Sequence, residues 1–238
     1  NFVRPFGPPA LQVASEEAAF LAECARQGAK ARLTAHVERK TASAANVVAT
    51  ISGTSPGLTP LVVMTPRSGW WWCASERGGG LVCWLEIMRA LRAAKPARDV
   101  LFVASSGHEL GHLGLDDFME RRPQLVSTAK AWIHLGANIG AAQGPGNILQ
   151  ASDDMLEAMM ADAMMKIGLR IDRRHPRGTA PRGEAENVHR GGGRYVSIIG
   201  SNDLFHNTSD RGPDTVDLRA IERFADAFAR VATSLAGD

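Results

Sequence analysis

The residues able to do chemistry gather behind short apolar segments that read as strands. Thr65 and Arg67 follow one such segment, His108 and Glu109 follow a second, and His206 lies in a loop after a third. Carboxylates and imidazoles are metal ligands and general acids or bases. In parallel α/β sheets, ligands bind at the carboxyl ends of the strands. The sequence therefore predicts one site to which all of these segments contribute.

Residues 108–112 spell His-Glu-Leu-Gly-His, the H-E-x-x-H pattern of the zincins. That pattern needs a helix, because only a helix puts both histidines on one face. Here the segment follows a strand and contains Gly111. We therefore expect His108 in a turn and His112 at the surface, where a helix begins.

Three side chains near these segments are candidate nucleophiles, with His108 or His206 as the base. They are Ser68, Cys73 and Ser75. For each of them a packing or loop role is the alternative.

A run of three tryptophans lies in the loop between Arg67 and Glu76. Such a run forms one wall of an apolar substrate pocket, or else it covers a helix end or a subunit contact. The substrate-binding residues predicted in this part of the chain are Thr65, Trp70, Trp71, Trp72, Ser75 and Arg77.

Alternating strands and helices must position these residues. Strands are expected at 31–37, 46–51, 61–64, 100–104, 131–135 and 195–199, and helices at 15–27, 78–94, 153–167 and 217–236. Residues 172–194 are rich in Arg and Gly and are expected to form a long surface loop. This order predicts an α/β fold of three layers, α/β/α, with a mostly parallel mixed sheet.

Composition limits the class of protein. The 238 residues are enough for a single large domain, which we expect over residues 1–238 with 1–13 as the entry from an upstream region. The net charge of +2 gives no argument for nucleic acid or a membrane surface as partner, and the sequence has no apolar run of about 18 residues, so we expect a soluble chain. Three cysteines without a C-x-x-C pair argue against a disulfide framework or a structural zinc site; Cys24 and Cys83 are expected in the core.

Four fragments resemble, in this order, the zinc-dependent exopeptidases of the aminopeptidase and glutaminyl-cyclase type. They are residues 46–53, 85–91, 108–114 and 206–210, and the resemblance extends over about residues 10–235. It implies the three-layer fold of that family's catalytic domain. It also implies hydrolysis of a small peptide or amide substrate, most simply removal of an N-terminal residue.

The metal-ligand positions of that family match this chain only in part. Its first histidine ligand falls on Thr65 and a later aspartate ligand on Gly136, and neither residue can replace the ligand. Its bridging aspartate falls on Glu76, while a glutamate and the final histidine are kept as Glu109 and His206. The resemblance therefore implies a dismantled di-zinc site with one metal or none.

One hypothesis keeps a single zinc. Glu76, Glu109 and His206 would supply the three protein ligands that a catalytic zinc needs. His108, which falls on the family's catalytic glutamate, would serve as the general base. This hypothesis makes the chain an amide hydrolase.

The competing hypothesis has no metal. Buried carboxylates then need cationic partners, and Arg67, with or without Arg77, would pair with Glu76 and Glu109. This arrangement allows metal-free chemistry, or an inactive homologue that keeps the pocket for ligand binding or assembly.

Three further residues complete the predicted surroundings. Asp210 is expected to orient His206, with a cap of the turn as the alternative. His134, on a strand, is expected in the core or beside a site residue. Glu184 matches an acidic residue of the family, with a solvated loop acid as the alternative.

Overall fold

The computed structural model describes residues 10–11, 13–36, 38 and 40–237, and the chain divides into two units, residues 1–43 and 44–238. The first unit contains the 3-10 helix η1 (Ser15–Glu17) and helix α1 (Ala18–Arg26), which confirm the helix expected at 15–27. The strand expected at 31–37 is wrong, because residues 31–36 pair with no other strand; Val37 lies outside the described residues. Cys24 is half-buried, not a core residue, because no residue of α1 is buried. A single domain over residues 1–238 stays a prediction.

The second unit is built on a seven-stranded mixed sheet in the order β1-β3-β2-β4-β7-β5-β6. Its strands are β1 (Val47–Ile51), β2 (Leu61–Pro66), β3 (Val100–Ser105), β4 (Ala131–Leu135), β5 (Gly146–Ala151), β6 (Arg173–Arg174) and β7 (Tyr195–Ser201). The four central strands β3, β2, β4 and β7 are parallel to one another. Next to them, β1 runs antiparallel to β3, and β5 runs antiparallel to β7. The parallel centre aligns the carboxyl ends of four strands along one edge.

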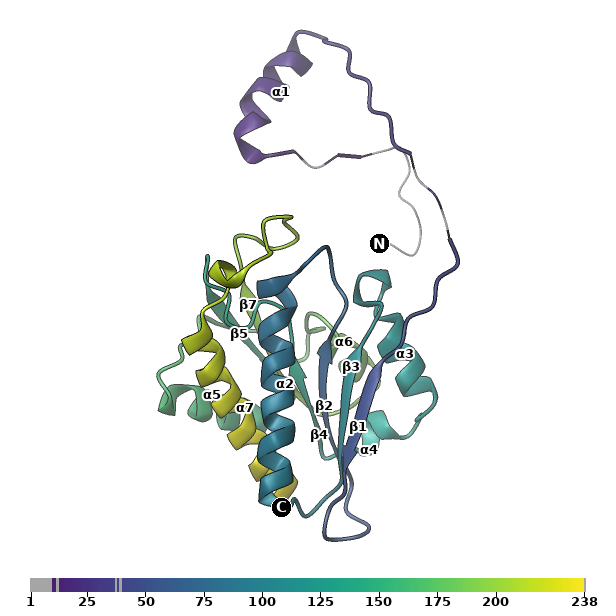
Figure 1. The fold of residues 1–238 in the computed structure, drawn as a ribbon, viewed down its shortest axis with the longest axis vertical. Helices are drawn as coiled ribbons and strands as arrows, with labels where there is room; N and C mark the ends of the chain where they lie inside the picture. The colour runs from purple at the N-terminus through teal and green to yellow at the C-terminus, as the bar shows by residue number, and fades with distance from the viewer. Residues whose placement is uncertain (1–9, 12, 37, 39, 238) are drawn as a thin grey trace. The chain divides into compact units, whose positions relative to one another are not determined.

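Helices cover both faces of this sheet (Figure 1). One face carries α2 (Ala74–Ala94), α5 (Asp154–Lys166) and α7 (Leu218–Gly237), and the other carries α3 (Leu113–Glu120), α4 (Leu125–Thr128) and α6 (Ala185–Arg190). Inward-facing Val63 and Phe102 pack with the first set, and Val62 and Val103 pack with the second. Alternate strand residues point to opposite faces, so a strand buried on both sides needs the continuous apolar runs seen in the sequence. The predicted three-layer α/β/α fold is confirmed.

Two local expectations are wrong. The segment 172–194 is not one loop, because it contains β6 and α6, and β5 was not anticipated at all. Helix α2 begins at Ala74 rather than at the glycine triplet, which lies inside its first turns. In the described part of the chain, no helix is both long and apolar enough to cross a membrane.

The glycine triplet lets α2 approach the segment that follows β4. A Cβ on Gly79 would lie 1.7 Å from the backbone oxygen of Ile139, whereas a Cβ on Gly78 would meet nothing within 4 Å. We expect Gly79→Ala to lower the free energy of unfolding by about 1–3 kcal/mol through overpacking. Gly78→Ala is the matched control and should raise it by about 0.5–1 kcal/mol, because alanine loses less backbone entropy in a helix. Urea unfolding of both variants measures the difference, and equal effects would contradict the close approach.

Candidate functional site

Three segments distant in the sequence meet at the carboxyl edge of the parallel strands. Glu76 comes from the first turn of α2, Glu109 from the 3-10 helix η2 (His108–Leu110) after β3, and His206 from the loop after β7. One ligand atom from each of these side chains lies within 4.8 Å of the others. The predicted convergence of Glu76, Glu109 and His206 is therefore present in the structure.

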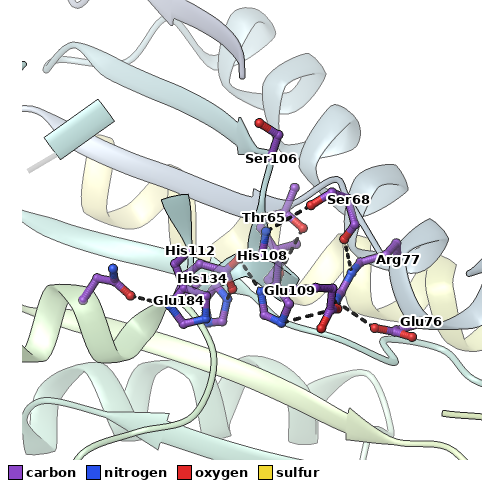
Figure 2. A network of polar contacts seen from close by, with 12 residues as sticks. Thr65, Ser68, Glu76, Arg77, Ser106, His108, Glu109, His112, His134 and Glu184 are labelled. Carbon is purple, nitrogen blue, oxygen red and sulfur yellow. Dashed lines mark hydrogen bonds and ion pairs between the residues drawn. The ribbon is translucent and has the colours of Figure 1, made fainter. Parts of the chain in front are cut away.

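Arg77 contacts both carboxylates of this group (Figure 2). Its Nη2 is 2.8 Å from Oε1 of Glu76 and 2.7 Å from Oε1 of Glu109. Its Nε donates to the backbone oxygen of Ser68 at 2.8 Å. The side chains of Arg77 and Glu76 are only 4% and 1% exposed. The guanidinium thus supplies the cation that two adjacent carboxylates require in a buried site.

Arg67 does not have the role predicted for it. Its side chain is exposed, and Nη1 donates to the backbone oxygen of Ala45 at 2.6 Å. Arg67 leaves the end of β2 away from the carboxylates, whereas Arg77 follows Glu76 directly on α2 and shares its buried environment. The cation that pairs with both carboxylates is therefore Arg77, and not the Arg67 that the sequence predicted with or without it.

Burial shapes the electrostatics of Glu76. Loss of solvent raises the pKa of this carboxyl, against the opposing effect of Arg77 and His206, and the neighbouring Glu109 raises it further. Nε2 of His206 lies 3.5 Å from Oε1 of Glu76 and 3.8 Å from Oε1 of Glu109. The ring of His206 is stacked on Phe205, with the ring centroids 3.9 Å apart. The group as a whole contains two carboxylates against one permanent cation.

Asp210 caps a helix and does not orient His206 as predicted. Its Oδ1 accepts from the backbone nitrogen and from Oγ of Ser75, both at 2.7 Å, and its Oδ2 accepts from the backbone nitrogen of Glu76 at 3.0 Å. These nitrogens are the unpaired donors at the start of α2. Ser75 is likewise buried and engaged in this cap. Asp210 therefore fixes the start of α2 and, with it, the positions of Glu76 and Arg77.

Thr65 and Gly136, which by resemblance fall on metal ligands of the exopeptidases, offer no free ligand atom in this structure. Thr65 is buried, and its Oγ1 donates to the backbone oxygen of Leu135 at 2.9 Å. At Gly136, a Cβ would lie 2.8 Å from the backbone oxygen of Ile198, so no ligating side chain fits there. The Glu76–Glu109–His206 group has ligand atoms close enough for one metal ion, and in this structure Arg77 pairs with its two carboxylates.

A second polar cluster lies beside the first and centres on Glu184, which is almost fully buried. Its Oε1 is 2.7 Å from Nδ1 of His108, and its Oε2 is 3.2 Å from Nε2 of His134 (Figure 2). Burial alone would raise the pKa of Glu184, but the hydrogen bonds from His108 and His134 outweigh it and hold the pKa well below the ordinary value. Burial lowers the pKa of His134, although Glu184 opposes this. The cluster is therefore an ionised carboxylate held between two imidazoles.

His112 belongs to the same cluster. It is half-buried, it precedes α3 in a left-handed conformation with φ 66°, and its ring centroid is 4.9 Å from that of His108. Its Nδ1 is 2.7 Å from Oδ1 of Asn187. Residues 108–112 form no α-helix, as predicted, yet ligand atoms of His108, His112 and Glu184 all lie within 4.8 Å of one another.

A cavity of about 420 Å³ opens beside the second cluster. Its lining includes His108, His134, Glu184, Arg182, Ile199 and Phe205. This mixture of apolar walls and a few polar groups is typical of small-molecule sites. The cavity gives the site a place for a ligand on the His108 side.

The tryptophan run lies differently from the pocket wall that the sequence suggested. Trp71 and Trp72 are 62% and 74% exposed. The ring of Trp70 meets His206 edge-on, with centroids 6.0 Å apart. None of the three lines the 420 Å³ cavity, so a substrate-binding role for them stays a prediction.

Cys73 is a poor nucleophile in this setting. Burial, together with the nearby Glu76, raises the pKa of its thiol to about 11. Because the thiolate is the reactive form, this thiol is unreactive at neutral pH. Its Sγ donates to the backbone oxygen of Trp70, which is a loop role.

The depressed pKa of Glu184 makes a pH-dependent contribution to stability. A carboxyl whose pKa is lower in the folded state stabilises the fold above the unfolded value of about 4.3, and this stability is lost as pH falls through the folded pKa. We expect Glu184→Gln to lower the free energy of unfolding by about 1.5–3 kcal/mol at pH 7, and by less below about pH 4. Urea unfolding across pH measures this, with exposed Glu186→Gln as control. A pH-independent difference would contradict it.

Sequence reasoning missed part of this cluster. The sequence indicates His134 and Glu184 only beside alternative roles, its H-E-x-x-H pattern points to His112, and nothing in it points to Asn187. The signal for Glu184 was its match to an acidic residue of the zinc exopeptidases. Its contacts with His108 and His134 span 76 and 50 residues, so no local pattern could reveal them.

Known structures resemble this fold, although no family model and no curated protein matches the chain. An aminopeptidase from Aneurinibacillus sp. strain AM-1 matches with TM-score 0.69 and 15% identity, over 81% of this chain and 48% of that one. BSAP, a zinc aminopeptidase from Bacillus subtilis, matches with TM-score 0.69 and 14% identity, over 81% and 50%. LapB from Legionella pneumophila matches with TM-score 0.66 and 17% identity, over 81% and 56%.

The chain spans about half the length of these solved structures, and the identities are low. The likeness therefore concerns the fold and leaves the activity open. Agreement between the predicted three-layer α/β/α fold, the observed sheet and the two aminopeptidase structures nevertheless identifies the architecture. This chain has the zinc exopeptidase-like α/β fold of the aminopeptidases.

Proposed function

We propose that this chain is an amide hydrolase that acts on a small peptide or a related amide, with water activated on the His108 side of the site. The observation that carries the proposal is the position of His108, which lines the cavity while buried Glu184 holds its Nδ1 at 2.7 Å. A carboxylate that fixes an imidazole is the usual device for setting its tautomer and orientation. In the reaction, water adds to the amide carbon, the C–N bond breaks and the amine leaves with a proton.

In this proposal Arg77, Glu76 and Glu109 have a structural role. Arg77 is buried against Glu76 and Glu109, so its charge is used within the protein. Nε2 of His108 lies 3.9 Å from Oε1 of Glu109, which connects the two halves. We propose that the Arg77 half holds Glu109 and η2 in place, so that His108 faces the cavity.

The fold and the cavity support an amide as the substrate class. The structures that share this fold include aminopeptidases. The cavity volume of about 420 Å³ is suited to one or two amino-acid residues rather than to a folded protein. Apolar Ile199 and Phe205 on its wall favour an apolar side chain in the substrate.

Turnover of a panel of aminoacyl 4-nitroanilides and dipeptides tests the proposal. We expect hydrolysis of the members with apolar side chains, and Phe205→Ala should raise their KM because it removes part of the wall. Leu110→Ala is the control, since Leu110 is also exposed but does not line the cavity. No turnover with any member of the panel would contradict the proposal.

A second candidate function is ligand binding without catalysis. The pairing of Arg77 with both carboxylates favours it, because this guanidinium lies where the exopeptidase metals would bind. Under this alternative, panel members bind in calorimetry but are recovered intact.

A further inference from the structure

We propose that His108, His112 and Glu184 form a site for one divalent transition-metal ion of the zinc type. This site is separate from the Glu76–Glu109–His206 group, and its metal binding does not depend on the proposed hydrolysis. Ligand atoms of the three side chains lie within 4.8 Å of one another. Two imidazoles and one carboxylate are a ligand set that zinc accepts, with its fourth position open to water or a ligand.

Hydrogen bonds with neighbouring residues fix the orientation of His112 for metal binding. Its Nδ1 is 2.7 Å from Oδ1 of Asn187, whose Nδ2 donates to Oδ1 of Asp116 at 2.6 Å. The orientation of the amide makes Oδ1 the acceptor, so Nδ1 of His112 carries the proton and Nε2 keeps its lone pair. Metal-binding histidines are commonly held this way through their other nitrogen.

Hydrogen bonds also fix the carboxylate of Glu184. Its Oε2 takes a hydrogen bond from Nε2 of His134 at 3.2 Å, while Nδ1 of His134 contacts Oγ of Ser197 at 2.8 Å. Gln150 donates to the same hydroxyl at 3.1 Å, which orients the chain of hydrogen bonds toward Glu184. One carboxylate oxygen is therefore fixed by the protein, and Oε1 faces His108.

The contact between His108 and Glu184 shows what the ion must displace. Nδ1 and Oε1 are 2.7 Å apart and hydrogen-bonded. Two atoms bound to one tetrahedral zinc at about 2.0–2.1 Å are about 3.3 Å apart. An ion bound through these atoms therefore replaces the proton and separates them by about 0.6 Å, a movement within the reach of side-chain rotation.

This site differs from its neighbour in charge. The Glu76–Glu109–His206 group already contains the guanidinium of Arg77. Outside the group of three ligands, the hydrogen-bond partners of these side chains among the described residues are His134 and Asn187, and neither is a permanent cation. Of the two candidate groups, a metal ion therefore meets less repulsion at His108, His112 and Glu184.

Zinc titration of chelator-treated protein tests the proposal. We expect one equivalent of Zn²⁺ to bind in calorimetry, and one of Co²⁺ to give visible absorption from nitrogen ligands. His112→Asn should weaken Zn²⁺ binding by about 100-fold or more, and Asn187→Ala by about 10–100-fold. The matched control is His206→Asn, which should leave the affinity unchanged. Both histidines have positive φ, 66° and 57°, and asparagine tolerates that conformation.

Two results would overturn the metal site. One is the absence of stoichiometric Zn²⁺ binding by the folded protein. The other is a loss of binding in His206→Asn together with unchanged binding in His112→Asn, which would place the ion at the first group. Because the ion would occupy Nδ1 of His108, hydrolysis is measured on chelator-treated protein. Zinc binding by that protein without any hydrolysis would sustain this proposal and contradict only the proposed function.

Discussion

Replacing Arg77 with methionine is expected to lower the free energy of unfolding by about 3–5 kcal/mol, because it leaves two neighbouring carboxylates without their cation. Methionine retains most of the volume, so the effect reports charge rather than a cavity. Glu76 is almost fully buried, and Nη2 of Arg77 lies within 2.8 Å of carboxylate oxygens of both Glu76 and Glu109. Urea unfolding at neutral pH measures the change.

Arg89→Met is the matched control for this prediction. Arg89 pairs with Glu86 on the exposed side of the same helix. Exposed ion pairs contribute about 0–1 kcal/mol, so this variant should stay close to the parent protein. Equal stability of Arg77→Met and the parent protein would contradict a buried role for the guanidinium.

The sign of the pH dependence gives a second check on Arg77. Arg77 opposes the rise that burial imposes on the pKa of Glu76, so its removal lets that pKa rise further. A carboxyl whose pKa is higher in the folded state favours folding at low pH, and this advantage is lost as pH rises through the folded pKa. The destabilisation by Arg77→Met should therefore be larger at pH 8 than at pH 5.

The Arg77→Met variant also tests whether the Glu76–Glu109–His206 group can bind a metal ion. Glu76, Glu109 and His206 keep ligand atoms within 4.8 Å of one another, and the variant leaves the space between them without a guanidinium. If Arg77→Met binds a second zinc that the parent protein excludes, the arginine itself keeps the metal out. If the variant binds no second zinc, the cause is too few ligands and not Arg77, because Thr65 and Gly136 provide none.

The sequence was sufficient for the centre of the fold and for the meeting of three site segments. β2, β3 and β4 are continuous apolar runs, and such runs occur where both faces of a strand are buried. The pattern fails for β5, whose sequence Gly-Asn-Ile-Leu-Gln-Ala mixes polar and apolar residues near the edge of the sheet. Edge strands and short helices such as α6 depend on tertiary contacts more than on local pattern.

Side-chain direction explains what the sequence could not decide in the site. The sequence predicted Arg67, with or without Arg77, as the cation that pairs with the carboxylates. Arg77 is buried because the cap by Asp210 fixes the first turn of α2, and that contact spans 134 residues. The links of Glu184 to His108 and His134 are equally remote, so the second cluster became visible only when the sheet brought these residues together.

Replacing His108 with alanine is expected to lower kcat/KM for the anilides that the parent protein hydrolyses by about 10²–10⁴-fold, the range for loss of a group that activates water. The size of the effect follows from position: His108 is the imidazole held by Glu184 through Nδ1 at the cavity wall. His175→Ala is the control, because His175 hydrogen-bonds within its own loop, to Ala180 and Thr179.

The split between kcat and KM decides what His108 does. If His108 activates water, its loss must appear in kcat, because that role is exercised only in the transition state. If it is only part of the cavity wall, KM rises while kcat stays the same, and water activation at His108 is excluded. The Glu184→Gln variant gives a further test, because it keeps the cavity lining but weakens the hydrogen bond to the imidazole of His108. A fall in kcat in this variant would show that the reaction depends on the orientation of His108 and not only on its volume.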